Sequence, residues 1–470
     1  MASVRVLIVT SGSVGDVAPY TGLGARIRDA GHDVTVASHA PFAAAFASAG
    51  LPFRPIPGDL REILPQARGQ DGRSSGTGPR ALARLLRIAR PLVGTLGDGI
   101  AAAAEETNPD VMLLSTVVAP LGYQVAEARG IPWAGVFLQP ISPTGDFGSV
   151  LLGGRSIGRR GNHAVTSVAN LVSQSLYARP VRDLRRRLGL THASIGELRT
   201  WQDGGRYPTF HGFSTAVVPR PSDWRPQLEI TGYWWPHSPP GWTPPPALAD
   251  FLAAGPPPVF VGFGSMAPAQ GGRLAPLIRR AVRRAGVRAV VQAGWAGLDV
   301  AGDDILTIGE APHDWLFPRM AAVVHHAGAG TTAAALRAGV PAVPVPVLAD
   351  QPFWAARIHA LGAGTRPIPM SQLTPGRLST DRLGTGRLST DRLATDQLGI
   401  DRLATDQLGI DRLAPDRLAA ALHEATTNPH RRARAQAIAA RLSTEDGPSR
   451  ILTWLETTHS KSSSAERTPP

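Results

Sequence analysis

A run of small residues near position 330 has the composition of a phosphate-binding turn. Residues 321–324 form a short apolar segment that predicts a buried parallel strand, and the sequence HHAGAGTT follows without bulky side chains. Helix-forming residues continue to Arg337, and Gly339 would close that helix. Such a turn leaves backbone N–H groups unpaired at the positive end of the helix, where a phosphate binds well. The residues expected to offer backbone or hydroxyl donors to the phosphate are Gly328, Ala329, Gly330 and Thr331.

Two polar residues follow the next predicted strand, Pro341–Val347. Asp350 offers a carboxylate and Gln351 offers an amide, and both groups are suited to the hydroxyls of a sugar. The alternative is an ordinary solvated loop. Together with the phosphate turn, the pair predicts a site that binds a sugar next to a phosphate.

A second polar turn lies near the amino terminus. The β-branched run Val4–Val9 predicts a central parallel strand, and a helix is expected from Val17. The turn between them carries Ser11, Gly12, Ser13 and Asp16. Ligands of doubly wound sheets bind at the carboxyl ends of the strands, so this turn is expected to line a cleft.

Apolar runs alternate with helical segments in both halves of the chain, which predicts two doubly wound parallel sheets. The strands expected in the first half are Val4–Val9, Asp33–Ser38, Phe53–Ile56, Asp110–Leu114 and Ile131–Leu138. Those expected in the second half are Val259–Phe263, Arg288–Gln292, Ile305–Ile308, Ala321–Val324 and Pro341–Val345. A loop-rich stretch, Ser142–Asn162, and a single helical stretch, Ala164–Leu188, are expected between them.

The prolines of residues 219–246 cannot occupy the interior of an element, so this stretch is predicted to be a linker. It would separate an N-terminal domain, residues 1–218, from a C-terminal domain, residues 247–428. Within the latter, leucine recurs every five residues, and we interpret 376–415 as a tandem insertion of pentapeptides. A weakly ordered loop is favoured there over a β-solenoid. Helices are expected over 429–458, followed by a disordered tail, 459–470.

The charge of the chain does not indicate nucleic-acid binding. The 470 residues carry a formal net charge of +12, but Lys461 is the only lysine and the arginines are scattered without interleaved aromatic residues. Contact with anionic lipid at a membrane surface remains an alternative. There is no cysteine, and no apolar run reaches the roughly 18 residues of a membrane span. We therefore expect a cytoplasmic protein.

The motif HHAGAGTT…AGVP…DQPFWAARI resembles the donor-binding signature of family-1 glycosyltransferases with the GT-B fold. It is most similar to the sterol-glucosyltransferase-like branch, and next to bacterial antibiotic and macrolide glycosyltransferases. The usual pattern has glycine where this chain has Ala327, which crowds the turn slightly. The resemblance implies an α/β, GT-B fold with two Rossmann-like doubly wound domains that face a cleft. It also implies that the last helix crosses back onto the N-terminal domain.

The resemblance also implies roles for single residues. Asp16 corresponds to the general base, although it could also be the N-cap of the Val17 helix, and Ser115 stands where histidine-using members carry an orienting acid. His325 corresponds to the histidine that meets the diphosphate, with a core histidine as the alternative; His326 stays undecided. Further matches to the donor site, with ordinary turn or core roles as alternatives, are Ser265, His313 and Trp315. No spacing suggests a metal site.

The function implied is an inverting transfer of a hexose, most plainly glucose from UDP-glucose, to a hydroxyl of a hydrophobic acceptor such as a sterol, polyketide or flavonoid. The UDP-sugar is a co-substrate, and no cofactor is expected. One rival is an antibiotic-tailoring transferase that uses a dTDP-deoxysugar. Other rivals are a GT-B sugar-nucleotide epimerase and a catalytically silent partner of another glycosyltransferase. The acceptor itself and the oligomeric state are not predicted.

Overall fold

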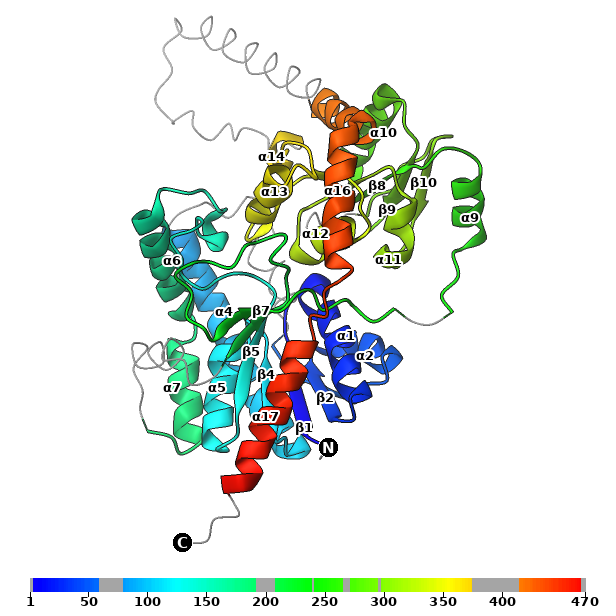
Figure 1. Cartoon of the computed structure of the whole chain (residues 1–470). Helices are drawn as coiled ribbons and strands as arrows, with labels where there is room; N and C mark the ends of the chain where they lie inside the picture. Colours follow the sequence, from blue (N-terminus) through cyan, green and yellow to red (C-terminus); the bar gives the residue numbers. More distant parts are fainter. Residues whose placement is uncertain are drawn as a thin grey trace, which may run out of the picture. The chain divides into compact units, whose positions relative to one another are not determined.

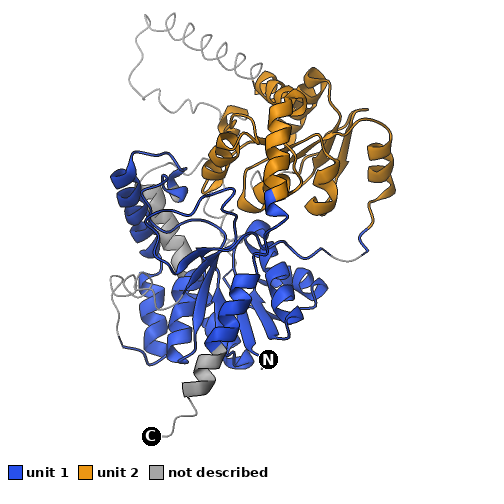
Figure 2. Cartoon of the chain, in the orientation of Figure 1, with its two compact units in different colours: residues 1–242, 441–470 blue, residues 243–440 orange. Residues whose placement is uncertain are grey.

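The structure is a computed structural model that describes residues 3–58, 79–191, 208–238, 241–264, 271–294, 297–373 and 414–465. The chain divides into two compact units (Figure 2). Unit 1 comprises Met1–Trp242 together with Arg441–Pro470, and unit 2 comprises Thr243–Ala440. Each unit contains one parallel sheet with helices, which confirms the predicted α/β class.

Unit 1 is built on a seven-stranded parallel sheet with the order β3-β2-β1-β4-β5-β6-β7 (Figure 1). Side chains of the central strand β1 (Arg5–Val9) alternate between the two faces, so Val6 and Ile8 join one hydrophobic cluster and Leu7 and Val9 join another. Both faces are therefore buried, as the uninterrupted apolar run predicts. The remaining strands are β2 (Asp33–Ser38), β3 (Phe53–Pro55), β4 (Val111–Leu114), β5 (Trp133–Phe137), β6 (Thr209–His211) and β7 (Leu228–Ile230).

Helices cover both faces of this sheet. The cluster of Val6 and Ile8 includes side chains of α1 (Val14–Asp29), α2 (Ala43–Ser48) and α17 (Ser449–Ala465). The opposite cluster includes side chains of α4 (Pro79–Thr107), α5 (Ala119–Ala128) and α7 (Ala178–Arg187). The unit also contains η1 (Ala40–Phe42), η3 (Val150–Leu152) and α6 (Arg159–Gln174).

The proline-rich segment 219–246 is not a linker along its whole length, which corrects the prediction. Within it, β7 pairs in parallel with β6, and Trp234 is buried in unit 1. Because β7 is the outermost strand of the sheet, prolines beside it interrupt few ladder hydrogen bonds. The division between the units falls between Trp242 and Thr243.

The helix expected over Ala164–Leu188 is divided into two. α6 begins at Arg159, inside the expected loop, and ends at Gln174, whereas α7 begins at Ala178. Pro180 lies in the first turn of α7, where its missing N–H needs no partner within the helix. A continuous helix would have left the carbonyl group of the preceding turn unpaired.

Unit 2 contains a five-stranded parallel sheet with the order β10-β9-β8-β11-β12. Its strands are β8 (Val259–Gly262), β9 (Ala289–Gln292), β10 (Ile305–Ile308), β11 (Ala322–His325) and β12 (Ala342–Pro344). Its helices include α9 (Pro246–Ala253), α10 (Gly271–Ala285), α11 (His313–Leu316), η4 (Phe317–Arg319), α12 (Ala329–Arg337), α13 (Gln351–Ala360), α14 (Met370–Leu373) and α16 (Pro429–Leu442). One hydrophobic cluster joins β8, β9 and β11 to α10 and to the helical residues 414–427.

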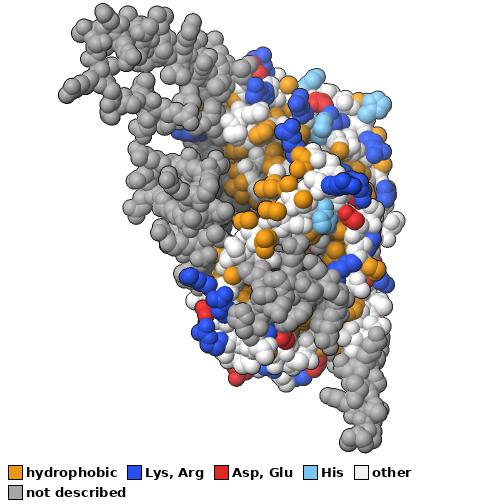
Figure 3. All heavy atoms as spheres, turned by 90° about the vertical axis from the view of Figure 1, so that its left-hand side faces the viewer, with side chains coloured by type: hydrophobic (Ala, Val, Ile, Leu, Met, Phe, Trp, Pro, Cys, Tyr) orange, Lys and Arg blue, Asp and Glu red, His pale blue; other side chains and the backbone are white. Residues whose placement is uncertain are grey.

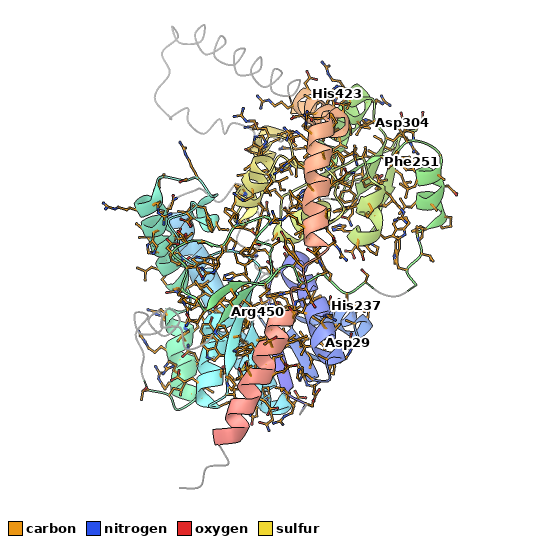
Figure 4. The ribbon with its side chains drawn as sticks, in the orientation of Figure 1. Asp29, His237, Phe251, Asp304, His423 and Arg450 are labelled. Atoms are coloured by element: carbon orange, nitrogen blue, oxygen red, sulfur yellow. The ribbon has the colours of Figure 1, made fainter. Side chains whose placement is uncertain are left out.

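The C-terminal helices separate between the units. α16 belongs to unit 2 as far as Ala440, whereas α17 belongs to unit 1, where Ile451 and Leu455 are buried. Arg450 lies near the start of α17 (Figure 4) and pairs with Glu229 of β7 at 2.8 Å. α17 continues to Ala465, so part of the tail expected to be disordered is helical. The sequence HSKSSSA contains no proline or glycine that would end the helix earlier.

Most of the predicted insertion, residues 376–413, lies outside the described residues. Ala414 and Pro415, the last two residues assigned to the insertion, are buried in unit 2 instead. Among the described residues, no helix is both long and apolar enough to cross a membrane.

Candidate active site

The strand order of unit 1 reverses between β1 and β4. Strands β2 and β3 lie on one side of β1, and β4 to β7 follow on the other. Ligands of open α/β sheets bind beyond the carboxyl ends of the strands at such a switch point. The turn from Thr10 to Asp16 follows β1, and Ser115 follows β4, with its N–H bonded to the Val9 carbonyl at 3.0 Å. The polar turn recognised in the sequence therefore lies at the switch point.

Asp16 lies in the first turn of α1, and its carboxylate is already engaged. α1 begins at Val14 rather than Val17, and Ser13 is the N-cap. Asp16 Oδ2 accepts the Ser13 backbone N–H at 2.9 Å and the Ser13 hydroxyl at 2.8 Å. Asp16 is thus the acidic member of a capping box and not the N-cap. The positive end of the helix and these donors stabilise the ionised carboxylate, which is the form that a general base requires.

Gln139, which the sequence did not single out, contacts the other oxygen of the same carboxylate. It lies just beyond β5, next to β4 in the sheet, and its Nε2 donates to Asp16 Oδ1 at 3.2 Å. The carboxyl ends of neighbouring parallel strands meet at one edge of the sheet, which explains why residues so distant in sequence touch. The signal available in the sequence was a polar residue directly after the apolar run Ile131–Leu138.

Ser11 and Gly12 form the tightly packed start of this turn. Ser11 Oγ lies 2.7 Å from His39 Nε2, and His39 Nδ1 lies 3.1 Å from the Ile56 carbonyl oxygen. Because a carbonyl oxygen only accepts, Nδ1 carries the proton and the Ser11 hydroxyl donates to Nε2. Gly12 has φ of +138°, and a Cβ there would lie 2.7 Å from the Cβ of Asp16. The glycine is therefore needed where the backbone passes Asp16, and His39 is a second residue that the sequence did not single out.

Unit 2 has a switch point of its own, between β8 and β11. His325 is the last residue of β11, and the small-residue turn leads from it into α12. The predicted phosphate turn therefore also lies at the carboxyl edge of a sheet, where the strand order reverses. Gly264 follows β8 at the same edge, whereas Ser265 lies outside the described residues.

The His325 side chain is fully buried and neutral. Its Nδ1 accepts the Ala327 N–H at 3.0 Å, so the proton of the imidazole lies on Nε2. Burial, with the nearby His326 and His313, lowers the pKa of His325 to about 3. Within the described residues, Nε2 has no hydrogen-bond partner. A buried N–H without a partner is costly, and a phosphate oxygen would satisfy it.

The two neighbouring histidines are neutral as well. Burial lowers the pKa of both His313 and His326 to about 4, and His313 stacks on Phe317 with ring centroids 4.3 Å apart. The three imidazoles therefore bring no positive charge to the turn, and attraction for a diphosphate must come from N–H donors. In the described part of the chain, no group of three His, Asp or Glu residues is arranged to hold a metal ion.

The start of α12 supplies such donors. The first helical turn holds Ala329, Gly330 and Thr331, whose N–H groups have no acceptor within the helix, and the N-cap Gly328 offers no side-chain cap. A Cβ at Gly328 would lie 2.5 Å from His326 Nε2, so only glycine fits there. Ala327 has φ of +61° and is fully buried, so the residue that departs from the family pattern occupies a conformation that favours glycine.

Trp315 is half-buried and belongs to the short helix α11. The guanidinium carbon of Arg319 lies 4.1 Å from the centroid of the Trp315 ring, and the Arg319 side chain donates to the Trp315 carbonyl at 2.5 Å. Trp315 is therefore not a fully enclosed core residue. A cation–π contact with Arg319 holds its indole in place. His313 belongs to the same short helix.

Asp350 and Gln351 are less free than the sequence suggested. Gln351 is buried, and its Oε1 accepts the N–H groups of Val347 at 2.8 Å and Leu348 at 3.2 Å. Asp350 Oδ2 accepts the Trp354 indole N–H at 2.8 Å. The side-chain oxygen of Gln351 thus stabilises the loop after β12. The Asp350 carboxylate is already hydrogen-bonded, and the Gln351 side-chain amide N–H groups are donors that a sugar hydroxyl could accept.

An apolar surface lies on α6 and the segment before it. Its members are large hydrophobic side chains that stay exposed: Leu152, Ile157, Val168, Leu171 and Val172. Figure 3 views the molecule from the side on which α6 lies in Figure 1, and hydrophobic side chains gather on this face. We call these five residues the α6 apolar surface. They belong to unit 1, the unit that carries Asp16.

Two family models match the chain. Residues 6–103 match the N-terminal domain of glycosyltransferase family 28, and residues 291–405 match the C-terminal domain of proteins similar to erythromycin biosynthesis protein CIII. The first match includes the Asp16 turn, and the second includes the His325 turn. Both candidate turns therefore fall in segments typical of glycosyltransferases.

Whole-chain comparisons agree. The chain is 35% identical over 388 residues to the O-mycaminosyltylonolide 6-deoxyallosyltransferase of Streptomyces fradiae, covering 78% of this chain and 86% of that protein. It is 31% identical over 388 residues to the sterol 3-beta-glucosyltransferase UGT80A2 of Arabidopsis thaliana, covering 80% of this chain but only 59% of that protein. This chain thus spans about 60% of the length of the plant relative it matches.

A solved structure supports the same fold. The Streptomyces sp. SF2575 glycosyltransferase SsfS6, complexed with thymidine diphosphate, superposes with a TM-score of 0.61 over 97% of this chain and 99% of that chain, at 21% identity. The two parallel-sheet units are those of the GT-B fold. With this fold, the two turns at its switch points and the similarity to the Streptomyces fradiae enzyme, the chain belongs to the family-1 glycosyltransferases of the GT-B fold.

Proposed function

We propose that this chain transfers a hexose with inversion, using UDP-glucose as the donor and a hydroxyl of a hydrophobic molecule such as a sterol, polyketide or flavonoid as the acceptor. The observation that carries the proposal is the neutral His325 at the end of β11, just before the turn into α12. Its buried Nε2–H lacks a hydrogen-bond partner among the described residues. A diphosphate oxygen is the ligand that this donor and the open helix end would share.

In the proposed reaction, the acceptor oxygen attacks the anomeric carbon while Asp16 takes the proton of the attacking hydroxyl. The bond between the anomeric carbon and the diphosphate oxygen breaks, and its electron pair leaves with UDP. Charge that develops on the diphosphate is stabilised by the His325 N–H and by the N–H groups of Ala329, Gly330 and Thr331. A single displacement of this kind inverts the anomeric centre.

The remaining candidate residues would also belong to the donor site. Trp315 and His313 would hold the nucleobase, as the resemblance implies, and Ser265 would face the phosphate or the sugar. Asp350 and the Gln351 amide would bind sugar hydroxyls. Because these donors are fixed dipoles, we expect transfer to proceed without an added metal ion, and a chelator to leave the rate unchanged.

The α6 apolar surface supports a hydrophobic acceptor. Exposed Leu152, Ile157, Val168, Leu171 and Val172 form a surface that water solvates poorly, and covering it with an apolar molecule gains about 25 cal/mol for each Å² removed from water. A polar acceptor such as a free sugar would gain little there. The surface favours a ring system of polyketide or sterol character over a small polar alcohol.

One structural observation keeps the dTDP-deoxysugar donor as a second candidate. The Gln351 carbonyl oxygen already accepts two backbone N–H groups, so the site has fewer acceptors for hexose hydroxyls than the sequence suggested. A sugar with fewer hydroxyl groups would leave fewer hydrogen bonds unmade there. The relative from Streptomyces fradiae is named as a deoxyallosyltransferase, and SsfS6 was solved with thymidine diphosphate.

A donor panel separates these candidates. Initial rates are measured with one accepted acceptor and equal concentrations of UDP-glucose, dTDP-glucose and a dTDP-6-deoxyhexose. The proposal expects the highest kcat/KM for UDP-glucose. A higher kcat/KM for dTDP-glucose would overturn the nucleotide assignment, and a further rise on removing the 6-hydroxyl would establish the deoxysugar donor.

A further inference from the structure

Two residues from different elements hold the Asp16 carboxylate. Ser13 occupies Oδ2 through its backbone N–H at 2.9 Å and its hydroxyl at 2.8 Å, and Gln139 occupies Oδ1 through its amide N–H at 3.2 Å. A carboxylate has about four lone-pair sites, so these contacts leave one, on Oδ1, for another proton. The oxygen that can still accept is therefore the oxygen that Gln139 contacts.

We propose that Gln139 is a positioning residue for the Asp16 base, since the Asp16 Oδ1 contact comes from Gln139 and not from Ser115. The inference rests on the proposed function. Histidine bases in this family are paired with an acid, whereas a carboxylate base needs a donor. An amide N–H is such a donor, and it stays protonated at every pH at which the protein is folded.

Gln139 fixes the direction of the Asp16 Oδ1 lone pair that can still accept a proton. Rotation about the last bond of an aspartate side chain is only weakly restricted, so a carboxylate fixed at Oδ2 alone can tilt. The amide contact at Oδ1 removes this freedom from a position beyond β5, while Ser13 acts from the start of α1. The acceptor hydroxyl then meets a lone pair with one direction, as an effective base requires.

During transfer, the O–H bond of the acceptor breaks and its proton goes to Oδ1, while the diphosphate leaves with the electron pair of the broken sugar bond. Gln139 itself exchanges no proton in this step.

The test compares Gln139→Met, which keeps the length of the side chain but has no donor, with Gln139→Glu, which places a second carboxylate beside Asp16. Gln227→Met is the control, since Gln227 directly precedes β7 at the amino edge of the same sheet. kcat and the KM values of donor and acceptor are measured for each at one pH. We expect kcat to fall about tenfold for Gln139→Met and further for Gln139→Glu, with both KM values nearly unchanged, because only the direction of the base is lost.

A purely structural role would lower the melting temperature of both Gln139 variants and raise KM together with any loss of kcat, which would overturn the proposal. A second readout does not need activity: the ¹³C carboxyl signal of Asp16, assigned by its loss in Asp16→Asn, is compared at neutral pH. Its chemical shift should change in Gln139→Met and stay in Gln227→Met. If wild-type protein transfers no sugar, the proposed function fails, and an unchanged ¹³C shift in Gln139→Met would separately overturn the Gln139 contact.

Discussion

Asp16 and His325 each lie close to the end of a central strand, yet their electrostatic settings are opposite. Asp16 is half-buried and receives three hydrogen bonds at the positive end of α1, which stabilises its charge. His325 is fully buried, and its pKa is lowered to about 3, so it is neutral and donates from Nε2. An ionised base and a neutral donor are the states that the proposed transfer needs at neutral pH.

Replacing Asp16 by asparagine should remove the base and keep the shape of the side chain. We expect kcat to fall by a factor of about 10² to 10⁴, the range typical of lost general-base catalysis, with donor KM nearly unchanged. Initial rates at saturating donor measure this. Asp29→Asn, at the exposed end of the same helix, should retain wild-type kcat. Full activity of Asp16→Asn would show that another group takes the proton.

The three neutral histidines predict how stability depends on pH. The pKa values of His313, His325 and His326 are lowered to about 4, 3 and 4, below the usual value of about 6.5. Below about pH 6.5 the unfolded chain binds protons that the folded chain refuses, so stability falls with decreasing pH toward about pH 4.

Urea unfolding at several pH values tests this dependence. Each such histidine contributes a slope of up to about 1.4 kcal/mol per pH unit in that window. His313→Asn should reduce the slope, whereas replacing the exposed His163 by asparagine should not. An unchanged slope in His313→Asn would contradict the assignment of a neutral buried imidazole.

The residues beside the base show what a sequence can and cannot reveal. Asp16 was recognisable because it lies in a polar turn directly after an apolar strand. Gln139 and His39 were not singled out, since their roles depend on which strands become neighbours. The hydrogen bonds of the Gln351 side-chain oxygen could not be predicted either. Its donors are backbone N–H groups, which every residue except proline carries, so the sequence does not indicate them.

At the scale of elements, the turn from β11 into α12 contains a strained residue beside the proposed phosphate site. Ala327 adopts φ of +61° without being glycine, a conformation that costs an L-residue about 1–2 kcal/mol. Its methyl group is also fully buried, which offsets part of that cost by about 0.8 kcal/mol. The turn holds the N–H groups at the start of α12 in an open arrangement, so strain here accompanies the proposed phosphate site.

Exchange of Ala327 for glycine should therefore be nearly neutral for stability or mildly stabilising. The matched control is Ala322→Gly, because Ala322 is equally buried but lies in the regular strand β11. We expect the control to lose about 1 kcal/mol or more relative to Ala327→Gly in denaturant unfolding. Equal losses in the two variants would contradict a left-handed conformation at Ala327.

Replacement of Leu171 by aspartate tests the α6 apolar surface. A charge in this surface should raise acceptor KM about tenfold or more and leave donor KM unchanged, since burying an unpaired carboxylate is costly. Ser173→Asp places the same charge at another exposed position of α6 and should have a smaller effect. Initial rates measured at increasing acceptor concentration and fixed donor concentration distinguish the two variants. An equal rise in acceptor KM in both variants would mean that the added charge, and not the loss of apolar contact, weakens acceptor binding.

Strands with a distinct apolar or β-branched run were predicted well, and the shortest strands were not. β2 and β10 were predicted with their observed bounds, because each is such a run bounded by polar or turn residues. β6 and β7 were missed, since they are three residues long and β7 lies among prolines. The break between α6 and α7 was missed because the helical composition continues through it.

At the scale of the whole molecule, unit 1 is assembled from both ends of the chain. Residues 441–470 belong with residues 1–242, and α17 contributes Ile451 and Leu455 to the same cluster as β1. Unit 2 is continuous and carries the donor turn. The proposed reaction therefore uses both units, one for the base and the acceptor and the other for the sugar nucleotide.

The division of the chain followed from sequence only in outline. The prolines predicted a linker over residues 219–246, and the two units divide within that stretch, between Trp242 and Thr243, but a part of it folds as β7. The family resemblance, and not the periodicity, suggested that a C-terminal helix returns to the first unit.

The measurement that tests the central claim most directly is mass spectrometry of the purified protein incubated with UDP-glucose and a mixed pool of sterols, polyketides and flavonoids. The account predicts an acceptor heavier by one hexosyl unit, formed together with UDP, and no such product from Asp16→Asn. Release of UDP without a heavier acceptor, or conversion of UDP-glucose into an isomer with no acceptor present, would contradict it.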